Sequence, residues 1–292
     1  METDYYPEVS GSGPDSGRAS DRIRLMGLPI DCVTENAAVA QILASIRAGC
    51  GGWVATPNVQ HLRILSSSSK LASLVSSADL IIADGMPLVW ASKLQGTPLP
   101  CRVTGSALIL SLTEAAARTN ASIFLLGGSP GTAERAAKVM VGQYQGLKIA
   151  GTLCPPLGFE ENETKFAGIC DEVRAARPRI VYCCLGFPKQ ELVIQRLRKE
   201  LPDSWFLGLG GSLSMVAGDV RRAPSWMQRM GLEWLWRLLK EPKRLAARYL
   251  AKDLPFAMRL LWSARQQGFT LKPNIRRRPT DLRVDSEKLV SN

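Results

Sequence analysis

The sequence predicts an α/β protein with a doubly wound, mostly parallel sheet, followed by a helical C-terminal appendage. Short, nearly continuous apolar runs alternate with helical patterns of about 10–15 residues, which is typical of a parallel sheet covered by helices on both faces. After Gly218 this alternation stops, and basic helical sequence rich in Trp and Leu follows without a strand signal. We therefore assign residues 21–218 to an α/β domain and residues 219–268 to a basic amphipathic helical appendage.

Six apolar runs are interpreted as strands, in chain order residues 51–58, 79–85, 122–128, 148–153, 179–186 and 204–211. Helices are expected over residues 35–49, 87–96, 106–120, 131–146, 161–178 and 189–201. In open parallel sheets, ligands bind outside the carboxyl ends of the strands. Candidate site residues at these ends are Thr56, Asn58, Asp84, Gly127, Gly128, Gly186, Gly210 and Gly211.

Composition limits the class of protein and its compartment. The chain has 292 residues, 46% of them hydrophobic, which is ample for a large core. Its seven cysteines are odd in number and lack C-x-x-C spacing, which argues against a disulfide framework or a zinc site and favours a reducing compartment. Residues 1–20 lack the features of a signal peptide and are expected to be disordered. No apolar run approaches the roughly 18 residues of a membrane span, so we expect a cytoplasmic location.

The net charge of +11 is concentrated near the C-terminus. Residues 221–278 carry 15 Lys or Arg against 3 Asp or Glu, a net +12, which leaves about −1 elsewhere. Helix breaks are expected near Pro242 and Pro255, and a disordered basic tail over residues 269–292. A solvated basic helix and a nucleic-acid-binding surface are the alternatives to a helix in a membrane interface. The apolar content favours lipid, because Leu and Arg are mixed with Trp226, Trp234, Trp236, Tyr249, Phe256 and Trp262.

Asp84 is the leading catalytic candidate. It directly follows an apolar run, and a carboxylate at a buried strand exit costs free energy unless it is used or paired. His61 is the only histidine, and a surface or capping role is favoured for it, so acid–base chemistry falls to carboxylates. The structural alternative for Asp84 is an Asp-Gly turn or a helix cap before Pro87.

Two loop motifs have both a functional and a structural interpretation. In "FLLGGSPGTAERAA", backbone N–H groups near Gly127 and Gly128 either hold a phosphate or form only a tight turn. In "GFPKQE", Gln190 either faces a ligand or belongs to an ordinary helix start. Neither G-x-G-x-x-G nor G-x-x-x-x-G-K-[ST] occurs, which disfavours a nicotinamide-dependent oxidoreductase and an ATPase. No His/Cys/carboxylate cluster has ligand spacing, so neither a metal nor another cofactor is expected.

Several motifs occur in an order that resembles one family: "ATPNVQHL", "ADLIIADGMPLVW", "RVTGSAL", "FLLGGSPG", "LGFPKQE", "GLGGSLSMVAGDVRRAPSWMQ" and "GLEWLWRLLKEPKRLAARY". Together they resemble the WecG/TagA/CpsF glycosyltransferases over about residues 23–260. The resemblance implies a Rossmann-like fold with a C-terminal membrane-targeting appendage. It also implies transfer of a sugar, often of the N-acetylmannosamine type, from a UDP donor to a polyprenyl-diphosphate-linked acceptor in cell-surface polysaccharide synthesis. The resemblance further implies that this transfer inverts the anomeric centre and needs no metal.

The family's site residues map onto this sequence by motif. The resemblance makes Asp84 the general base and places Thr56 and Asn58 in the donor and acceptor pocket. It adds Arg102 and Gln190, and the appendage arginines proposed to reach the diphosphate, Arg237, Arg244 and Arg248. Part of one helical face carries all three arginines unless Pro242 rotates it away. The family's usual motif Gly-Gly-x-Phe-Asp has Leu213 and Ser214 here at its last two positions. The identity of the family's donor sugar is therefore not transferred to this chain.

The expected function is therefore a hexosyltransferase-type enzyme that is cytoplasmic and peripheral on the inner face of the plasma membrane. Its expected partners are a UDP-sugar, a polyprenyl-diphosphate-linked acceptor and an anionic membrane surface, with no nucleic acid. A homo-oligomer remains open. The alternative from a different class is a non-catalytic module that binds membrane or nucleic acid through its basic appendage.

Overall fold

The computed structural model describes residues 22–271, except for the side chains of Ser225, Arg229, Arg244 and residues 269–271. The N-terminal segment expected to be disordered, residues 1–20, lies outside the described residues. The same holds for all but the start of the basic tail expected from residue 269.

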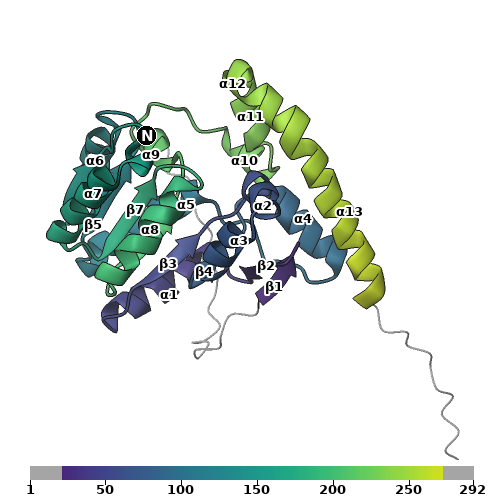
Figure 1. Cartoon of the computed structure of the whole chain (residues 1–292), viewed down its shortest axis with the longest axis horizontal. Coiled ribbons are helices and arrows are strands. Elements are labelled where there is room, and N and C mark those ends of the chain that lie inside the picture. Colours follow the sequence, from purple (N-terminus) through teal and green to yellow (C-terminus); the bar gives the residue numbers. More distant parts are fainter. Residues whose placement is uncertain (1–21, 272–292) are drawn as a thin grey trace, which may run out of the picture.

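The predicted parallel sheet is confirmed (Figure 1). Its strands are β3 (Gly52–Ala55), β4 (Leu80–Ile81), β5 (Ile123–Gly127), β6 (Ile149–Leu153), β7 (Ile180–Cys184) and β8 (Trp205–Gly208). They lie in the order β4-β3-β8-β7-β5-β6, and every neighbouring pair is parallel. In register, Val54 pairs with both Leu80 and Leu207. All the carboxyl ends therefore lie at one edge of the sheet.

Helices cover both faces of the sheet, as the sequence predicts (Figure 1). They are α1 (Glu35–Arg47), α4 (Met86–Gln95), α5 (Gly105–Thr119), α6 (Thr132–Gln143), α7 (Glu163–Ala176) and α8 (Lys189–Glu200). Side chains alternate along each strand. Val54 therefore faces the apolar cluster that includes α1, α5 and α6, while Trp53 faces the cluster that includes α4, α7 and α8.

The sequence analysis missed a short antiparallel hairpin, β1 (Arg22–Leu25) and β2 (Leu28–Asp31). Its turn needs positive φ at Met26 and Gly27, and its strands are too short to give a periodic signal. The Asp31 carboxylate joins the hairpin to the sheet. It accepts from the Ile81 N–H at 2.7 Å and pairs with Arg22 at 2.8 Å.

Two further short helices were also missed, α2 (Val59–Leu65) and α3 (Ser69–Ser76). The residue before each helix caps its N-terminus: the Asn58 side chain accepts from the His61 N–H, and the Ser68 side chain accepts from the Leu71 N–H. Both helices lie between β3 and β4, so the strand exits at Thr56 and Asp84 are separated by a helical connection.

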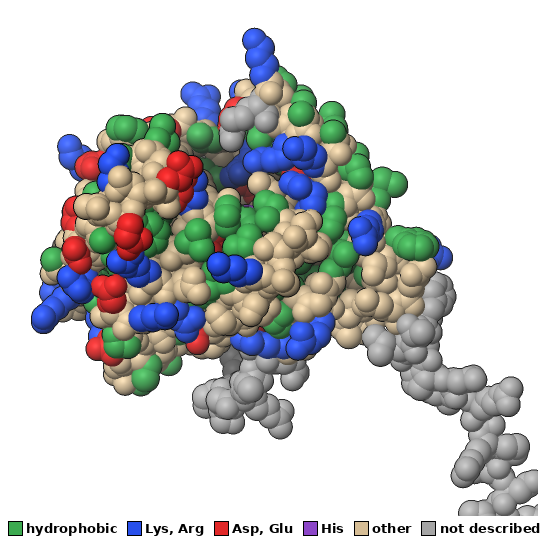
Figure 2. All heavy atoms as spheres, viewed as in Figure 1, with side chains coloured by type: hydrophobic (Ala, Val, Ile, Leu, Met, Phe, Trp, Pro, Cys, Tyr) green, Lys and Arg blue, Asp and Glu red, His purple; other side chains and the backbone are tan. Residues whose placement is uncertain are grey.

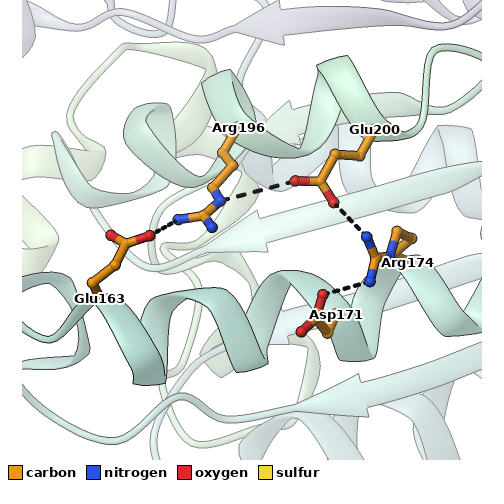
Figure 3. Close-up of polar contacts among 5 residues, drawn as sticks. All are labelled: Glu163, Asp171, Arg174, Arg196 and Glu200. Carbon is orange, nitrogen blue, oxygen red and sulfur yellow. Dashed lines mark hydrogen bonds and ion pairs between the residues drawn. The ribbon is translucent and has the colours of Figure 1, made fainter.

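A chain of ion pairs links α7 to α8 (Figure 3). Arg196 of α8 pairs with Glu163 and lies 3.9 Å from Glu200. Arg174 of α7 lies 3.5 Å from Glu200 and 2.6 Å from Asp171. The partners are partly or largely exposed, so we assign the network an orienting role between two helices rather than a large part of the stability.

The chain continues through α9 (Ser212–Val216) into α10 (Ser225–Arg229), α11 (Glu233–Lys240), α12 (Pro242–Arg248) and α13 (Leu254–Leu271). The predicted break near Pro242 is confirmed, because Glu241 has φ −131° and ψ 57°. Near Pro255 the prediction of a break is wrong. A π-helical turn, Tyr249–Asp253, carries the helix through, with the Leu254 N–H donated to the Tyr249 carbonyl.

Helix α13 lies along α4 (Figure 1). Phe256, Leu260 and Ala264 are buried in the same apolar cluster as Leu88 of α4. Gly268 lies so close to the Leu94 carbonyl that a Cβ there would overlap with it. Within residues 22–271, no helix combines the length and apolarity needed to cross a bilayer.

Candidate active site at the carboxyl edge of the sheet

The strand exits that the sequence singled out are joined by direct contacts. Thr56, which follows β3, donates its hydroxyl to the Gly208 carbonyl at the end of β8, at 2.7 Å. Asp84, which follows β4, donates its N–H to the Pro57 carbonyl at 3.0 Å. The ends of β4, β3 and β8 therefore form one continuous rim, with Asp84 at its outer end.

Asp84 lies half-buried in this rim. Its Oδ2 accepts from the Gly105 N–H, the first residue of α5, at 3.4 Å. Burial, and to a lesser extent the nearby Glu233 carboxylate, raises the pKa of Asp84 to about 6. The Gly105 N–H and the positive charges of Arg102 and Arg237 act in the opposite direction. A carboxylate with this pKa can accept a proton near neutral pH.

Arg102 connects this rim to the C-terminal helices. Its guanidinium donates to the Gln228 carbonyl at 2.9 Å and lies 3.6 Å from the Glu233 carboxylate. Both charged side chains are largely buried, 16% and 14% exposed. Gly231, at φ +75°, packs against Met86, two residues after Asp84. The turn between α10 and α11 is thus seated directly beside the candidate base.

Asn58 and His61 belong to the start of α2, which follows β3. The Asn58 side chain caps α2, while its Cβ is the neighbour of Gly85. His61, for which the sequence favoured a surface or capping role, is partly exposed, and its N–H donates to the Asn58 side chain in the cap of α2. Its ring stacks on Phe187 with centroids 4.5 Å apart. Burial lowers the pKa of His61 to about 4, an effect that the Arg248 charge reinforces and the Thr56 backbone opposes. His61 is therefore neutral at pH 7.

Gln190 is buried and engaged within the protein. Its amide oxygen accepts from the Gly210 N–H at 3.0 Å, and its amide nitrogen donates to Glu191 at 3.0 Å. These contacts favour a role in holding the loop after β8 rather than direct contact with a ligand.

Glu191 is a buried carboxylate that the sequence analysis did not single out. Burial raises its pKa to about 7, and its Oε2 has no hydrogen-bond partner among the described residues. It lines a narrow crevice with Thr56, His61 and Phe187.

The glycine-rich turn after β5 is occupied by the protein's own groups. The Gly128 N–H donates to the Cys184 carbonyl at 3.2 Å, and a Cβ on Gly127 would overlap with that carbonyl. At the start of α6, the Asp219 carboxylate accepts from Thr132 and Arg135, both at 2.8 Å. These contacts favour the tight-turn interpretation of this motif over phosphate binding.

The loop after β8 begins with two glycines and leads into a buried residue of α9. Gly210 has φ +55°, which favours glycine, and Gly211 is exposed. Leu213, where the family often has Phe, is fully buried among α5 and α6 side chains. The carbonyl of Ser214 accepts from the Val220 N–H at 3.1 Å. Leu213 is therefore a core residue. Leu in place of the family's usual Phe keeps an apolar side chain at this position, which is compatible with the same fold.

The three appendage arginines do not share one helix. Arg237 belongs to α11, and its charge acts on Asp84. Arg248 ends α12, where it lies 3.9 Å from Asp253 and acts on His61. Arg244 also belongs to α12, but its side chain is outside the described residues. The break at Glu241 separates the two helices, so Arg237 and Arg248 approach different parts of the rim. Figure 2 shows Lys and Arg side chains gathered along the hollow between the α/β part and the C-terminal helices.

Glu233 is the main site residue that sequence reasoning missed. It is the only acidic residue between Asp219 and Glu241, in a segment that is otherwise basic. An isolated carboxylate among arginines is the sequence signal that could have identified it. Asp253 is a second case, because it is buried and pairs with Arg63 of α2 at 3.0 Å.

No group of three or more His, Cys, Asp or Glu side chains within the described part of the chain is arranged to hold a metal ion. The rim instead offers a carboxylate of raised pKa flanked by guanidinium groups. Such a set can remove a proton from a hydroxyl and stabilise negative charge on a phosphate.

Comparison with known proteins gives consistent matches. A family model described as "Glycosyl transferase WecG/TagA/CpsF family" matches residues 23–269. Proteins of Bacillus spizizenii and Bacillus subtilis, both named N-acetylglucosaminyldiphosphoundecaprenol N-acetyl-beta-D-mannosaminyltransferase, are 32% and 33% identical to this chain. Each alignment spans 194 residues, which is 66% of this chain and 73% of the relative.

Proposed function

Because the chain belongs to the WecG/TagA/CpsF family of glycosyltransferases, we propose that it transfers a sugar from a UDP-sugar to a polyprenyl-diphosphate-linked acceptor. The acceptor class is supported by the names of the two Bacillus relatives, which specify N-acetylglucosaminyl-diphosphoundecaprenol. Those names also specify an N-acetylmannosaminyl group. The donor proposed here is accordingly an N-acetylmannosamine-type sugar or another hexose.

The observation that carries this proposal is Asp84, half-buried at a strand exit with its pKa raised to about 6 and two arginines beside it. In the proposed step, Asp84 accepts the proton of the acceptor hydroxyl while that oxygen attacks the anomeric carbon of the donor. The bond from the anomeric carbon to the diphosphate oxygen breaks, and its electron pair leaves with UDP. A single displacement of this kind inverts the anomeric centre. The proton then passes from Asp84 to solvent.

The leaving diphosphate needs positive charge, and this chain offers it as arginines. Arg237 and Arg248 belong to the C-terminal helices and act on Asp84 and His61, and Arg102 contacts the Gln228 carbonyl of the same helices. A guanidinium group can donate two parallel hydrogen bonds to a phosphate, and its positive charge neutralises the negative charge of the diphosphate without a metal ion. Thr56 and Gln190 position the backbone after β8, where the donor is proposed to lie.

We also propose that the C-terminal helices hold the protein against an anionic membrane, where a lipid-linked acceptor resides. Helices α10 to α13 leave large apolar side chains exposed: Trp226, Met230, Trp234, Leu239, Leu250, Leu254, Met258 and Trp262. Basic residues in the same helices add roughly 1 kcal/mol each near an anionic surface. Apolar and basic side chains together are typical of interfacial binding.

The direct test is UDP release from a panel of UDP-sugars, with and without an N-acetylglucosaminyl-diphosphate acceptor on a short polyprenyl chain. We expect release that depends on the acceptor and on one preferred donor, with the product anomer opposite to that of the donor by NMR. Acceptor-independent release, or a product that retains the donor configuration, would overturn the proposed reaction. Asp84→Asn is the matched inactive control.

A further inference from the structure

Glu233 is a carboxylate of the C-terminal helices that reaches the α/β part of the molecule. It begins α11, and its side chain is 14% exposed. Its Oε2 lies 3.6 Å from the Arg102 guanidinium, which is held from a second side by the Gln228 carbonyl at 2.9 Å. The turn between Gln228 and Glu233 contains Gly231, which packs on Met86. This turn therefore brings Glu233 to the rim and fixes Arg102 at the same time.

Asp84 is surrounded by a balanced set of charges. Arg102 faces it from the loop before α5, and Arg237 and Glu233 face it from α11. The Gly105 N–H at the start of α5 is its hydrogen-bond donor. Among the described residues, no ion pair joins Arg102 to Asp84, and the guanidinium of Arg102 contacts Glu233 and Gln228. If Glu233 were absent, Asp84 would be the only carboxylate in this set that could pair with Arg102.

We propose that Glu233 is a positioning residue for catalysis: it holds Arg102 toward α11 and away from Asp84, so that Asp84 becomes a strong base only when the α10–α11 turn is seated on Met86. This inference rests on the proposed role of Asp84 as the general base. It gives the C-terminal helices a task in the proton transfer itself, separate from membrane binding and from contact with the diphosphate.

The direction of the effect follows from the charges. After burial, the Glu233 carboxylate is the largest influence that raises the pKa of Asp84, whereas Arg102 and Arg237 lower it. Removing the negative charge at position 233 lowers the pKa of Asp84 directly. It also frees Arg102 to pair with Asp84, which lowers that pKa again. Both consequences leave Asp84 ionised at lower pH but weaker as a base.

The test is the pH dependence of kcat/KM in the full-length chain with Glu233→Gln, which keeps the side-chain shape and removes the charge. We expect the acid limb of the profile to move down by roughly 0.5–1 pH unit. We also expect the plateau above pH 7 to fall by about threefold or more, as for a weaker base. Glu233→Asp keeps the charge and should restore the limb toward the wild-type position.

Glu241→Gln is the matched control, because it removes one negative charge at the junction between α11 and α12 and is expected to leave the profile in place. A Glu233→Gln protein whose activity falls equally at all pH values, with an unmoved acid limb, would overturn the proposal and leave Glu233 a structural residue. In the Arg102→Gln background, Glu233→Gln should shift the limb less than in wild type, since one of its two effects is gone. An equal shift in both backgrounds would refute the part played by Arg102.

Asp84→Asn separates this inference from the proposed function. If Asp84→Asn is inactive and the Glu233→Gln profile is unmoved, only the role of Glu233 is wrong. If Asp84→Asn retains normal turnover, the base assignment itself is wrong, and the role of Glu233 falls with it.

Discussion

Asp84 carries a charge that its surroundings disfavour, and a residue kept in that state is a candidate for chemistry rather than for stability. Its backbone N–H already fixes the rim through Pro57, so the side chain is not needed to form the turn. We expect Asp84→Asn to fold normally and to lose about 10²-fold or more in kcat, the usual contribution of a general base. Near-normal kcat in a folded variant would exclude Asp84 from the proton transfer.

The same substitution should change stability in a pH-dependent way. The folded state raises the pKa of Asp84 from 3.8 to about 6, so ionised Asp84 disfavours folding above pH 6, and the effect fades as the pH falls toward 3.8. At pH 8, Asp84→Asn should therefore raise the free energy of unfolding by about 1–3 kcal/mol. Near pH 4 the two proteins should be equal. Denaturant unfolding at both pH values measures this, and a variant that is less stable at pH 8 contradicts it.

At the scale of elements, α11 brings positive charge to the rim through Arg237. Reversing that charge with Arg237→Glu adds repulsion toward a diphosphate in place of attraction. We expect kcat/KM to fall by about 10²-fold, since charged hydrogen bonds to phosphate contribute about 1.5–3 kcal/mol and reversal costs at least as much. Arg276→Glu, in the basic C-terminal segment, is the comparison and should have a much smaller effect. Equal losses in the two variants would remove Arg237 from the proposed site.

Helix α13 has one exposed apolar face and one buried face. Trp262 and Met258 are both 64% exposed, whereas Phe256 and Leu260 lie in the core against α4. Trp262→Ser should weaken binding to vesicles that contain anionic lipid while leaving Tm within about 2 °C, because surface changes alter stability little. Phe256→Ser should instead lower stability by about 3 kcal/mol or more. Co-sedimentation and thermal unfolding distinguish these effects. If Trp262→Ser bound vesicles as well as wild type, the outer face of α13 would not be the membrane contact.

At the scale of the whole molecule, the α/β part and the C-terminal helices meet around one rim, and the charges of that rim come from both. Since arginines are proposed to neutralise the diphosphate, activity should survive a chelator. We expect the rate in EDTA to stay within about twofold of the untreated rate, because no charge at the site would have been removed. Loss of activity in EDTA that Mg²⁺ or Mn²⁺ restores would refute the metal-free mechanism.

The amino-acid sequence by itself determined the six strands of the parallel sheet, the main helices and the edge at which the candidate residues lie, but not the hairpin of β1 and β2 or the short helices α2 and α3. Apolar periodicity and glycine placement are local signals, and a parallel sheet brings all its strand exits to one edge. The sequence could not show which polar groups of the loops form hydrogen bonds within the protein. Gln190 and Gly128 looked available to a ligand, yet Gly210 and Cys184 engage them.

Only the tertiary structure decided which charges meet. Glu233 lies far along the chain from Asp84, and the two approach because Gly231 seats the α10–α11 turn on Met86. The break at Glu241 also places Arg237 and Arg248 on separate helices, where spacing along the sequence allowed one shared face. A contact between distant segments depends on packing angles and turn geometry, and no local pattern of residues encodes these. The ion pair between Arg102 and Glu233 therefore became visible only in the folded chain.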